Sequence, residues 1–86
     1  MARFEIEITR SAEKRLGAVP RADQKRLAQA MLALAEEPRP RGARKLTGYE
    51  DVFRIRVGRY RVLYSIEENR LVVLILKVGH RSDVYR

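Results

Sequence analysis

The chain has 86 residues, the length of one small domain, and we expect a single domain over residues 1–86. Hydrophobic residues make up 45% of it, which excludes a disordered tail, and the lack of cysteine excludes disulfides and thiol chemistry. No apolar run approaches the roughly 20 residues that a membrane-spanning helix needs. These features are typical of a cytoplasmic protein that does not contact a membrane.

Positive charge is concentrated in the middle of the chain. The formal net charge is +8, and residues 38–64 carry eight basic and two acidic groups, whereas residues 1–37 carry seven basic and six acidic groups. A basic segment beside a near-neutral remainder favours a surface that binds a polyanion such as nucleic acid. An ordinary solvated surface is the alternative that charge alone leaves open.

The first two elements follow from periodicity and capping. Residues 3–9 alternate between apolar and polar side chains, which predicts a half-buried strand. Thr9 or Ser11 can cap a short helix after this strand. That helix should run to about Gly17 and bury its apolar side chains at helical spacing.

A second helix should begin after Pro20, because proline is tolerated in a first helical turn. Pro38 disfavours helix at the residue before it, so this helix should end near Glu37 and pack against the first as an antiparallel hairpin. Residues 38–48 are rich in proline, glycine and basic residues and are expected to form a loop. The apolar stripe of the second helix should comprise Leu27, Ala30, Met31, Leu34 and Ala35.

Three further strands are predicted in the second half of the chain. Residues 52–57 and 60–66 alternate and are joined by a two-residue turn at Gly58 and Arg59. Residues 71–76 are apolar on both faces, which is typical of a central, covered strand, although the length of the preceding turn leaves its register open. The order β-α-α-β-β-β predicts an α+β fold, with a helical hairpin on one face of a mostly antiparallel four-stranded sheet.

The predicted hairpin brings three arginines together. A two-residue turn places Arg56 directly opposite Arg61, and Arg54 lies two residues along on the same face. Like charges that oppose each other across two strands are destabilising by up to about 1 kcal/mol, so folding alone gives no reason for this arrangement. Arginine binds phosphate with two parallel hydrogen bonds. We therefore expect an anion site here, and a solvated strand face is the alternative.

The segment after the last predicted strand carries the single histidine of the chain, His80, whose side chain could reach the sheet face. Histidine transfers protons near neutral pH, although a lone histidine is more often structural or exposed. Tyr49 and Tyr85 could stack on RNA bases or lie at the edge of the core. One histidine and no cysteine exclude the usual zinc patterns, so we expect a metal-free mechanism without a cofactor.

These patterns together resemble the signature of the RelE/ParE toxin superfamily. The resemblance is carried by Leu-Thr-Gly at 46–48, by the hairpin sequence VFRIRVGRYRVLY at 52–64 and by the tail VGHRSDVYR at 78–86. It covers nearly the whole chain, and the tail is similar to that of the RelE branch. The resemblance thus implies a RelE-like fold.

The resemblance also implies a function: a toxin of a type II toxin–antitoxin system that cleaves mRNA on the ribosome by attack of a 2′-hydroxyl on the adjacent phosphate. By position, Arg61 would stabilise the phosphate in the transition state, Arg81 would help the leaving oxygen, and Tyr85 would orient a nucleotide. The partners would be the ribosome, mRNA and a RelB-like antitoxin with an acidic or amphipathic helix. The candidate RNA-binding residues are Arg44, Lys45, Tyr49, Arg54 and Arg56.

One departure from the family affects the proton chemistry. The best-known member has lysines at the positions of Arg54 and Arg56, and arginine effectively never loses its proton. His80 then becomes the first candidate for proton transfer, and Tyr85 the second. A ParE-type toxin that inhibits DNA gyrase without enzymatic activity is an alternative, as is an RNA-binding protein without chemistry. The basic hairpin and the His-Arg tail favour the nuclease.

Overall fold

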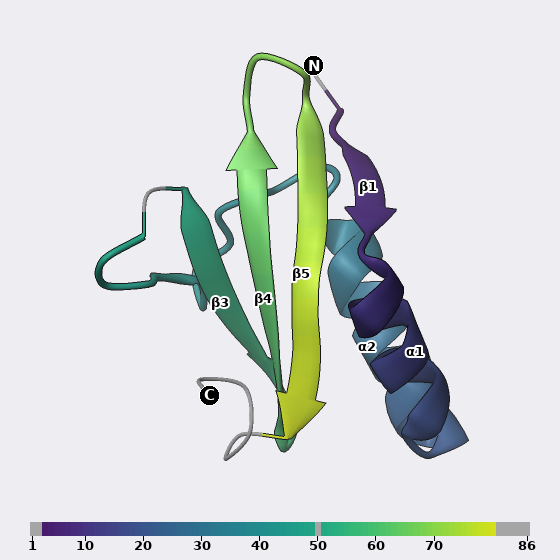
Figure 1. Ribbon diagram of the computed structural model, residues 1–86. Coiled ribbons are helices and arrows are strands. Elements are labelled where there is room, and N and C mark those ends of the chain that lie inside the picture. The colour runs from purple at the N-terminus through teal and green to yellow at the C-terminus, as the bar shows by residue number, and fades with distance from the viewer. Residues whose placement is uncertain (1–2, 50, 81–86) are drawn as a thin grey trace.

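The computed structural model describes residues 3–49 and 51–80. Within them, five strands form one sheet in the order β1-β5-β4-β3-β2, and two helices cover one face of it (Figure 1). β1 is parallel to β5 and the other neighbours are antiparallel, so the α+β class and the helical hairpin are confirmed. The elements are β1 (Glu5–Ile8), α1 (Arg10–Ala18), α2 (Arg21–Ala33), β2 (Arg44–Lys45), β3 (Val52–Val57), β4 (Tyr60–Glu67) and β5 (Val72–His80).

The sheet has one strand more than the four that the sequence predicts. The expectation of a loop throughout residues 38–48 is wrong at Arg44 and Lys45, which pair with Arg54 and Phe53 as the edge strand β2. A strand of two residues is too short to show an alternating pattern, so periodicity could not indicate it.

Thr9 is the residue that caps α1. Its hydroxyl accepts a hydrogen bond from the Ala12 N–H at 3.2 Å and donates one to the Leu76 carbonyl at 3.0 Å. The cap therefore ties the start of α1 to the central strand β5.

Neither described helix is long and apolar enough to cross a membrane.

α2 ends earlier than predicted, at Ala33 instead of near Glu37. The N–H groups of residues 34–36 donate to carbonyls three positions back, at 3.1–3.2 Å, so the chain continues in tighter turns. Leu34 and Ala35 nevertheless stay buried, as the apolar stripe predicts.

β5 is the central strand that the sequence predicts, but it runs to His80 and not only to residue 76. The pairing of β4 with β5 shifts where Leu63 lies opposite Lys77 while Tyr64 lies opposite Ile75. Leu76 is thus one extra residue on β5, which is the definition of a β-bulge. The bulge interrupts the alternation, which is why the pattern does not indicate the last four residues of the strand.

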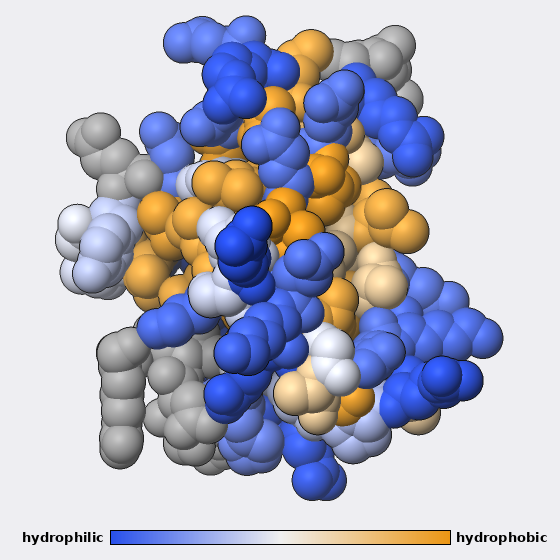
Figure 2. Space-filling view, turned by 45° about the vertical axis from the view of Figure 1, so that its right-hand side comes forward, coloured by the Kyte–Doolittle hydropathy of each residue, from blue (hydrophilic) through white to orange (hydrophobic). Residues whose placement is uncertain are grey.

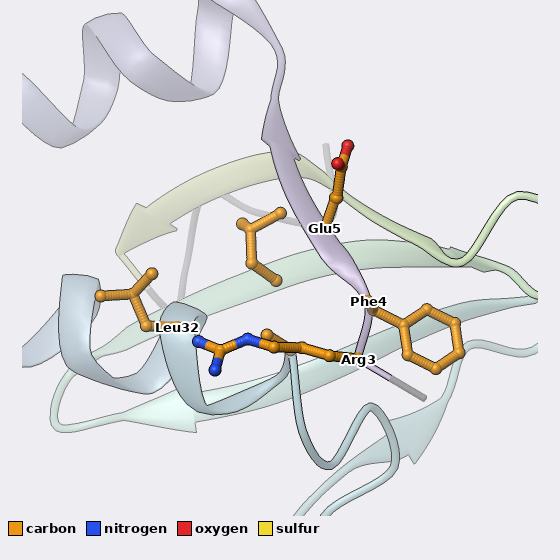
Figure 3. A pocket seen from close by; sticks show the side chains of 6 residues that line it. Arg3, Phe4, Glu5 and Leu32 are labelled. Atoms are coloured by element: carbon orange, nitrogen blue, oxygen red, sulfur yellow. The ribbon is translucent and has the colours of Figure 1, made fainter. Parts of the chain in front are cut away.

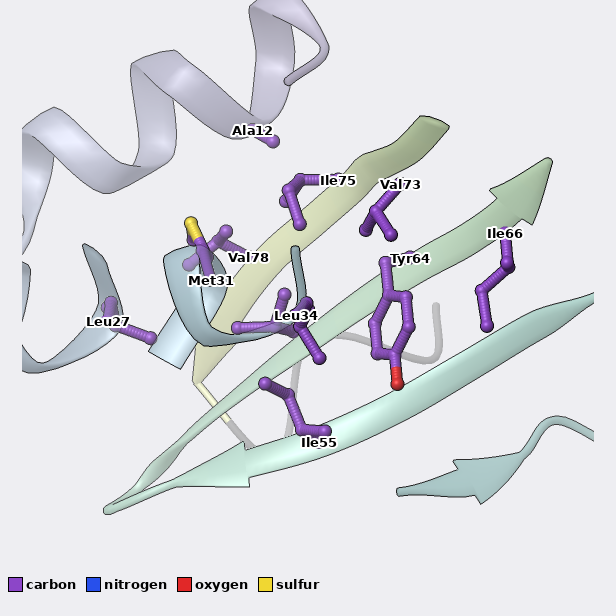
Figure 4. Packing of buried hydrophobic residues seen from close by; sticks show 11 residues of the cluster. Ala12, Leu27, Met31, Leu34, Ile55, Tyr64, Ile66, Val73, Ile75 and Val78 are labelled. Atoms are coloured by element: carbon purple, nitrogen blue, oxygen red, sulfur yellow. The ribbon is translucent and has the colours of Figure 1, made fainter. Parts of the chain in front are cut away.

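The core lies between the helices and one face of the sheet (Figure 4). Tyr64 is fully buried there, and its hydroxyl donates to the Pro38 carbonyl at 2.6 Å. Its ring stacks on that of Phe53, with centroids 5.9 Å apart. Burial raises the pKa of Tyr64 to about 12, although Arg39 acts in the opposite direction.

The start of the described chain is fixed to the end of α2. The Phe4 N–H donates to the Ala35 carbonyl at 2.8 Å, and Arg3 forms an ion pair with Glu36 at 3.6 Å. A shallow hollow of about 420 Å³ lies at this point, with the exposed Leu32 on its α2 side (Figure 3). Its lining combines apolar side chains with one cation and one carboxylate.

We predict that Tyr64→Phe lowers the free energy of unfolding by about 1 kcal/mol near neutral pH, because the Pro38 carbonyl loses its donor. The folded-state pKa lies above the unfolded value of about 10, so this group contributes full stability below pH 10 and loses it as the pH rises toward 12. Urea unfolding near neutral pH and at about pH 11 measures both effects. Between neutral pH and about pH 11, the free energy of unfolding of Tyr64→Phe should fall by less than that of the wild type. An equal fall in both proteins would contradict this assignment.

Candidate nucleic-acid interface

Four arginines lie together on the sheet face that the helices leave uncovered. Arg56 is directly opposite Arg61, and Arg44 is directly opposite Arg54. Directly opposed residues have Cβ atoms about 4.5–5.5 Å apart, and Arg54 and Arg56 are two positions apart on β3, so all four share one face. We call these four residues the arginine cluster.

The turn between β3 and β4 sets the register of this cluster. Gly58 has φ +61°, the left-handed backbone conformation that glycine adopts without strain. Val57 consequently pairs with Tyr60, and Arg56 with Arg61, as the sequence predicts. Arg44 is an addition, because its place opposite Arg54 depends on the unpredicted strand β2.

The chain does not neutralise most of this cluster. Within residues 3–49 and 51–80, no carboxylate forms an ion pair with Arg44, Arg54 or Arg56. Arg44 and Arg56 are exposed and Arg54 and Arg61 are half-buried, with the Arg61 Nε atom shielded from solvent. Partial burial strengthens the interaction of a cation with an anion that reaches it. Arg3, Arg26, Arg39 and Arg70, which do form ion pairs with described carboxylates, lie outside the cluster.

Away from the cluster, the uncovered face carries apolar side chains among polar ones, such as Glu67, which the register places on the same face. Leu63 lies opposite Arg54 on one side and Lys77 on the other, so its side chain shares the face of the cluster, and Leu74 follows on β5. Figure 2 brings the β1 and β5 side of the molecule forward and shows apolar surface between charged groups above and below it. The uncovered face therefore places the arginine cluster beside apolar side chains of β4 and β5.

An apolar hollow opens beside Arg56. β2 pairs with β3 only as far as Arg54, so no described strand opposes the remainder of that edge. A hollow of about 510 Å³ lies between this edge and α2, with Ile55, Val57 and Ala30 in its lining and Glu37 at its border. Arg56 of the arginine cluster thus borders a hollow that is lined mainly by apolar side chains.

Two other predicted contact residues lie at the border of the cluster. Lys45 pairs with Phe53, so it shares the helix-covered face and does not point with Arg44. Tyr49 is 61% exposed in the loop after β2, where a shallow hollow of about 420 Å³ runs from Lys45 to Tyr49. An exposed ring of this kind is accessible to a base, and it does not belong to the core.

The structure does not bring His80 to the arginine cluster. His80 is the last residue of β5 and pairs with Tyr60, whose side chain packs on the helix-covered core. The expectation that His80 follows the strand and reaches the arginine face is therefore wrong. Arg81 and Tyr85, the other two predicted catalytic residues, lie outside the described residues.

Sequence reasoning missed a polar contact on the helix side. The Tyr60 hydroxyl donates to Asp23 of α2 at 3.3 Å, and the Tyr60 ring meets the edge of the His80 imidazole with centroids 6.1 Å apart. Asp23 and Tyr60 are 37 positions apart in the sequence, and Tyr60 fits the apolar alternation of its strand. No local pattern could have indicated this contact.

Comparison with known proteins gives a consistent set of similarities. Residues 6–85 match the family model described as the ParE toxin of the type II toxin–antitoxin system parDE. The protein named RelE1 in Methanocaldococcus jannaschii is 26% identical over 87 residues, which span 98% of this chain and 97% of that protein.

Solved structures are similar over the same length. A chain from the archaeal RelE–RelB complex of Pyrococcus horikoshii is 32% identical with a TM-score of 0.83, covering 98% of this chain and 100% of that one. A chain from the toxin–antitoxin complex RelBE2 of Mycobacterium tuberculosis is 30% identical with a TM-score of 0.82, covering 96% and 97%.

We predict that Arg56→Gln maintains or raises the free energy of unfolding at low salt, by up to about 1 kcal/mol, because it removes repulsion from Arg61. Added salt should shrink the gain, since it screens charges that lie near the surface. Urea unfolding at low and high salt measures the difference. Lys25→Gln, which removes an exposed cation from α2, is the matched control and should show no comparable gain; an equal response of both variants would argue against local repulsion.

Proposed function

The chain belongs to the RelE/ParE family of toxins of type II toxin–antitoxin systems, and from that premise we propose that it is a ribosome-dependent endoribonuclease that cleaves mRNA. One observation carries the proposal. Arg56 and Arg61 oppose each other at the turn end of the hairpin, and no described carboxylate pairs with Arg44, Arg54 or Arg56. A bound phosphate would offset the repulsion that this arrangement creates.

The proposed reaction is an internal transfer within RNA. The 2′-oxygen attacks the adjacent phosphorus, the bond from phosphorus to the 5′-oxygen breaks, and the products are a cyclic phosphate and a 5′-hydroxyl. Negative charge accumulates on the phosphoryl oxygens in the transition state, and fixed cations at that point are often the largest contribution to rate. Half-buried Arg61 is assigned this role and Arg56 faces it, so the mechanism is proposed to be metal-independent.

Proton transfer is assigned away from the arginine cluster, because guanidinium groups effectively do not lose protons. His80 is the first candidate from the sequence, but its pairing with Tyr60 puts the imidazole on the other face of the sheet. We therefore propose Tyr85 as the group that moves a proton or orients the nucleotide, and Arg81 as the cation near the leaving oxygen. Both remain assignments by resemblance.

RNA binding is proposed to extend along the arginine cluster. Arg54 and Arg56 would contact backbone phosphates, with Arg44 beside them on β2, whereas Lys45 points to the other face and would be reached only around the edge of the sheet. Tyr49 is exposed at the end of this track and could stack on an unpaired base. A basic track beside an exposed ring suits single-stranded RNA, whose bases are not hidden in a helix.

The proposed protein partner is an antitoxin, as in the RelE–RelB complexes to which the fold is similar. The uncovered face offers arginines beside an apolar region that includes Leu63 and Leu74. An amphipathic helix with acidic residues along one border matches both regions at once. Such a partner would occupy the phosphate-binding side chains and block RNA. A short acidic protein encoded by the neighbouring gene would support this assignment.

Inhibition of DNA gyrase is the second candidate, because the matching family model is described by the name ParE. Programmed ribosomes and a gyrase supercoiling assay separate the two functions directly. Cleaved mRNA with a 5′-hydroxyl on the downstream fragment supports the nuclease. Inhibited supercoiling with intact mRNA would replace it by the gyrase inhibitor, and ribosome binding without either effect would indicate a binding protein.

We predict that Arg61→Ala lowers the rate of mRNA cleavage on programmed ribosomes by about 100-fold or more, the usual loss when one charge-stabilising donor is removed. Arg61→Lys should recover only part of this loss, because lysine cannot bind a phosphate through two parallel donors. Lys25→Ala is the control and should cleave at the wild-type rate. Wild-type cleavage by Arg61→Ala would remove the arginine from the mechanism.

We further predict that the triple variant Arg54→Ala, Arg56→Ala, Arg61→Ala binds single-stranded RNA more weakly and with a flatter salt dependence. Three lost phosphate contacts should reduce the slope of log affinity against log salt by about 2. Fluorescence anisotropy with a labelled oligonucleotide over a salt series measures the slope. An unchanged slope would show that RNA contacts a different surface.

A further inference from the structure

A chain of contacts runs from α2 to the end of β5 on the helix-covered side of the sheet. The Asp23 carboxylate accepts hydrogen bonds from Arg26 at 3.0 Å and from the Tyr60 hydroxyl at 3.3 Å. The Tyr60 ring then meets the His80 imidazole edge-on, at 6.1 Å between centroids and 78° between planes. One half-buried carboxylate therefore fixes a ring that in turn contacts the chain's single histidine.

Tyr60 lies between the turn of the hairpin and the end of β5. It is the first residue of β4, directly before Arg61, and it pairs with Val57 on one side and His80 on the other. The same side of α2 also reaches the turn, since the Arg26 guanidinium lies 3.7 Å from the position that a Cβ would take on Gly58. Asp23 and Arg26 of α2 thus lie beside Tyr60 and the turn of the hairpin, and Tyr60 in turn contacts the last residue of β5.

The contact between Tyr60 and Asp23 includes a hydrogen bond, which packing alone would not require. The ends of strands open most easily, and an apolar pair would be enough to cover this one. Tyr60 is instead fixed by a directional hydrogen bond, and burial together with the Asp23 carboxylate raises its pKa, so it remains a donor. Arg59 has the opposite effect on that pKa and does not reverse it.

We propose that Tyr60 is a positioning residue: held by Asp23, its ring fixes the imidazole of His80 and so the end of β5, from which the chain continues to Arg81. His80 then acts through its ring contact and not by proton transfer. This inference rests on the proposed nuclease function, and it explains why the histidine lies on the face opposite the arginine cluster. Loss of this anchor is expected to lower cleavage, because Arg81 is the next residue in the sequence after His80.

The first test separates the ring of Tyr60 from its hydroxyl. Tyr60→Phe keeps the ring and Tyr60→Leu removes it. Because the chain has one histidine, its imidazole proton resonances are assigned without ambiguity, and the ring current of residue 60 shifts them. We expect Tyr60→Phe, which keeps the ring but loses the hydrogen bond to Asp23, to show a reduced shift and a partly reduced cleavage rate. Tyr60→Leu should lose the shift and about tenfold or more in kcat, since small displacements of reacting groups have effects of that size.

The second test separates packing from proton transfer at His80 and does not depend on the folding of the Tyr60 variants. His80→Phe keeps a ring against Tyr60 without a titrating nitrogen, whereas His80→Ala removes the ring. Cleavage retained by His80→Phe and lost by His80→Ala is the expected result. Equal loss in both would overturn the proposal in favour of proton transfer, and full activity in both would overturn it as well.

The controls keep this inference separable from the proposed function. Wild-type protein that cleaves no mRNA would reject the nuclease assignment, whatever the histidine resonances show. Wild-type cleavage that Tyr60→Leu and His80→Ala leave unchanged would reject the positioning role alone. Lys25→Ala, exposed on the same helix as Asp23, should leave the histidine resonances and the cleavage rate at their wild-type values.

Discussion

The repulsion between Arg56 and Arg61 is the constraint on which the uncovered face depends. The two guanidinium groups are held opposite each other by a turn of two residues, so neither can move to another position along its strand. Folding tolerates this because the other sides of β3 and β4 are packed against α2, through Ile55, Val62 and Tyr64. The helix-covered face supplies the stability that allows an unfavourable arrangement of charge on the opposite face.

The two faces of the sheet therefore differ in role: one forms the core and the other carries the candidate site. The covered face contains the core and the contacts that fix the hairpin, including Tyr64 with the Pro38 carbonyl and Tyr60 with Asp23. The uncovered face carries apolar side chains and the three arginines Arg44, Arg54 and Arg56, with which no described carboxylate forms an ion pair. Under the proposed function, an RNA strand and an antitoxin helix would compete for this surface, and the competition would keep the toxin inactive.

Local sequence patterns predict most of this fold and three of the four arginines of the cluster. The hairpin of β3 and β4 and its register follow from Gly58 and strict alternation, so Arg54, Arg56 and Arg61 are placed correctly. The cap at Thr9 and the central position of β5 also follow from local rules. These features depend on residues that are close in the sequence, where geometry leaves few choices.

Features that depend on distant residues could not be predicted. β2 is too short to show periodicity, and its pairing with β3 brings Arg44 to the cluster. The early end of α2 reflects tighter turns after Ala33, not the proline that follows. The contact of Tyr60 with Asp23 joins two elements that no local pattern connects.

The bulge at Leu76 has a consequence for the whole end of the chain. In an uninterrupted strand, counting by twos from Ile75, which faces the core, would put His80 on the side of the arginines. The surplus residue reverses that parity, and His80 pairs with Tyr60 on the helix side instead. A single extra amino acid thus decides which surface the end of β5 serves. Related chains that lack this insertion in register would present the residue at this position to the opposite surface.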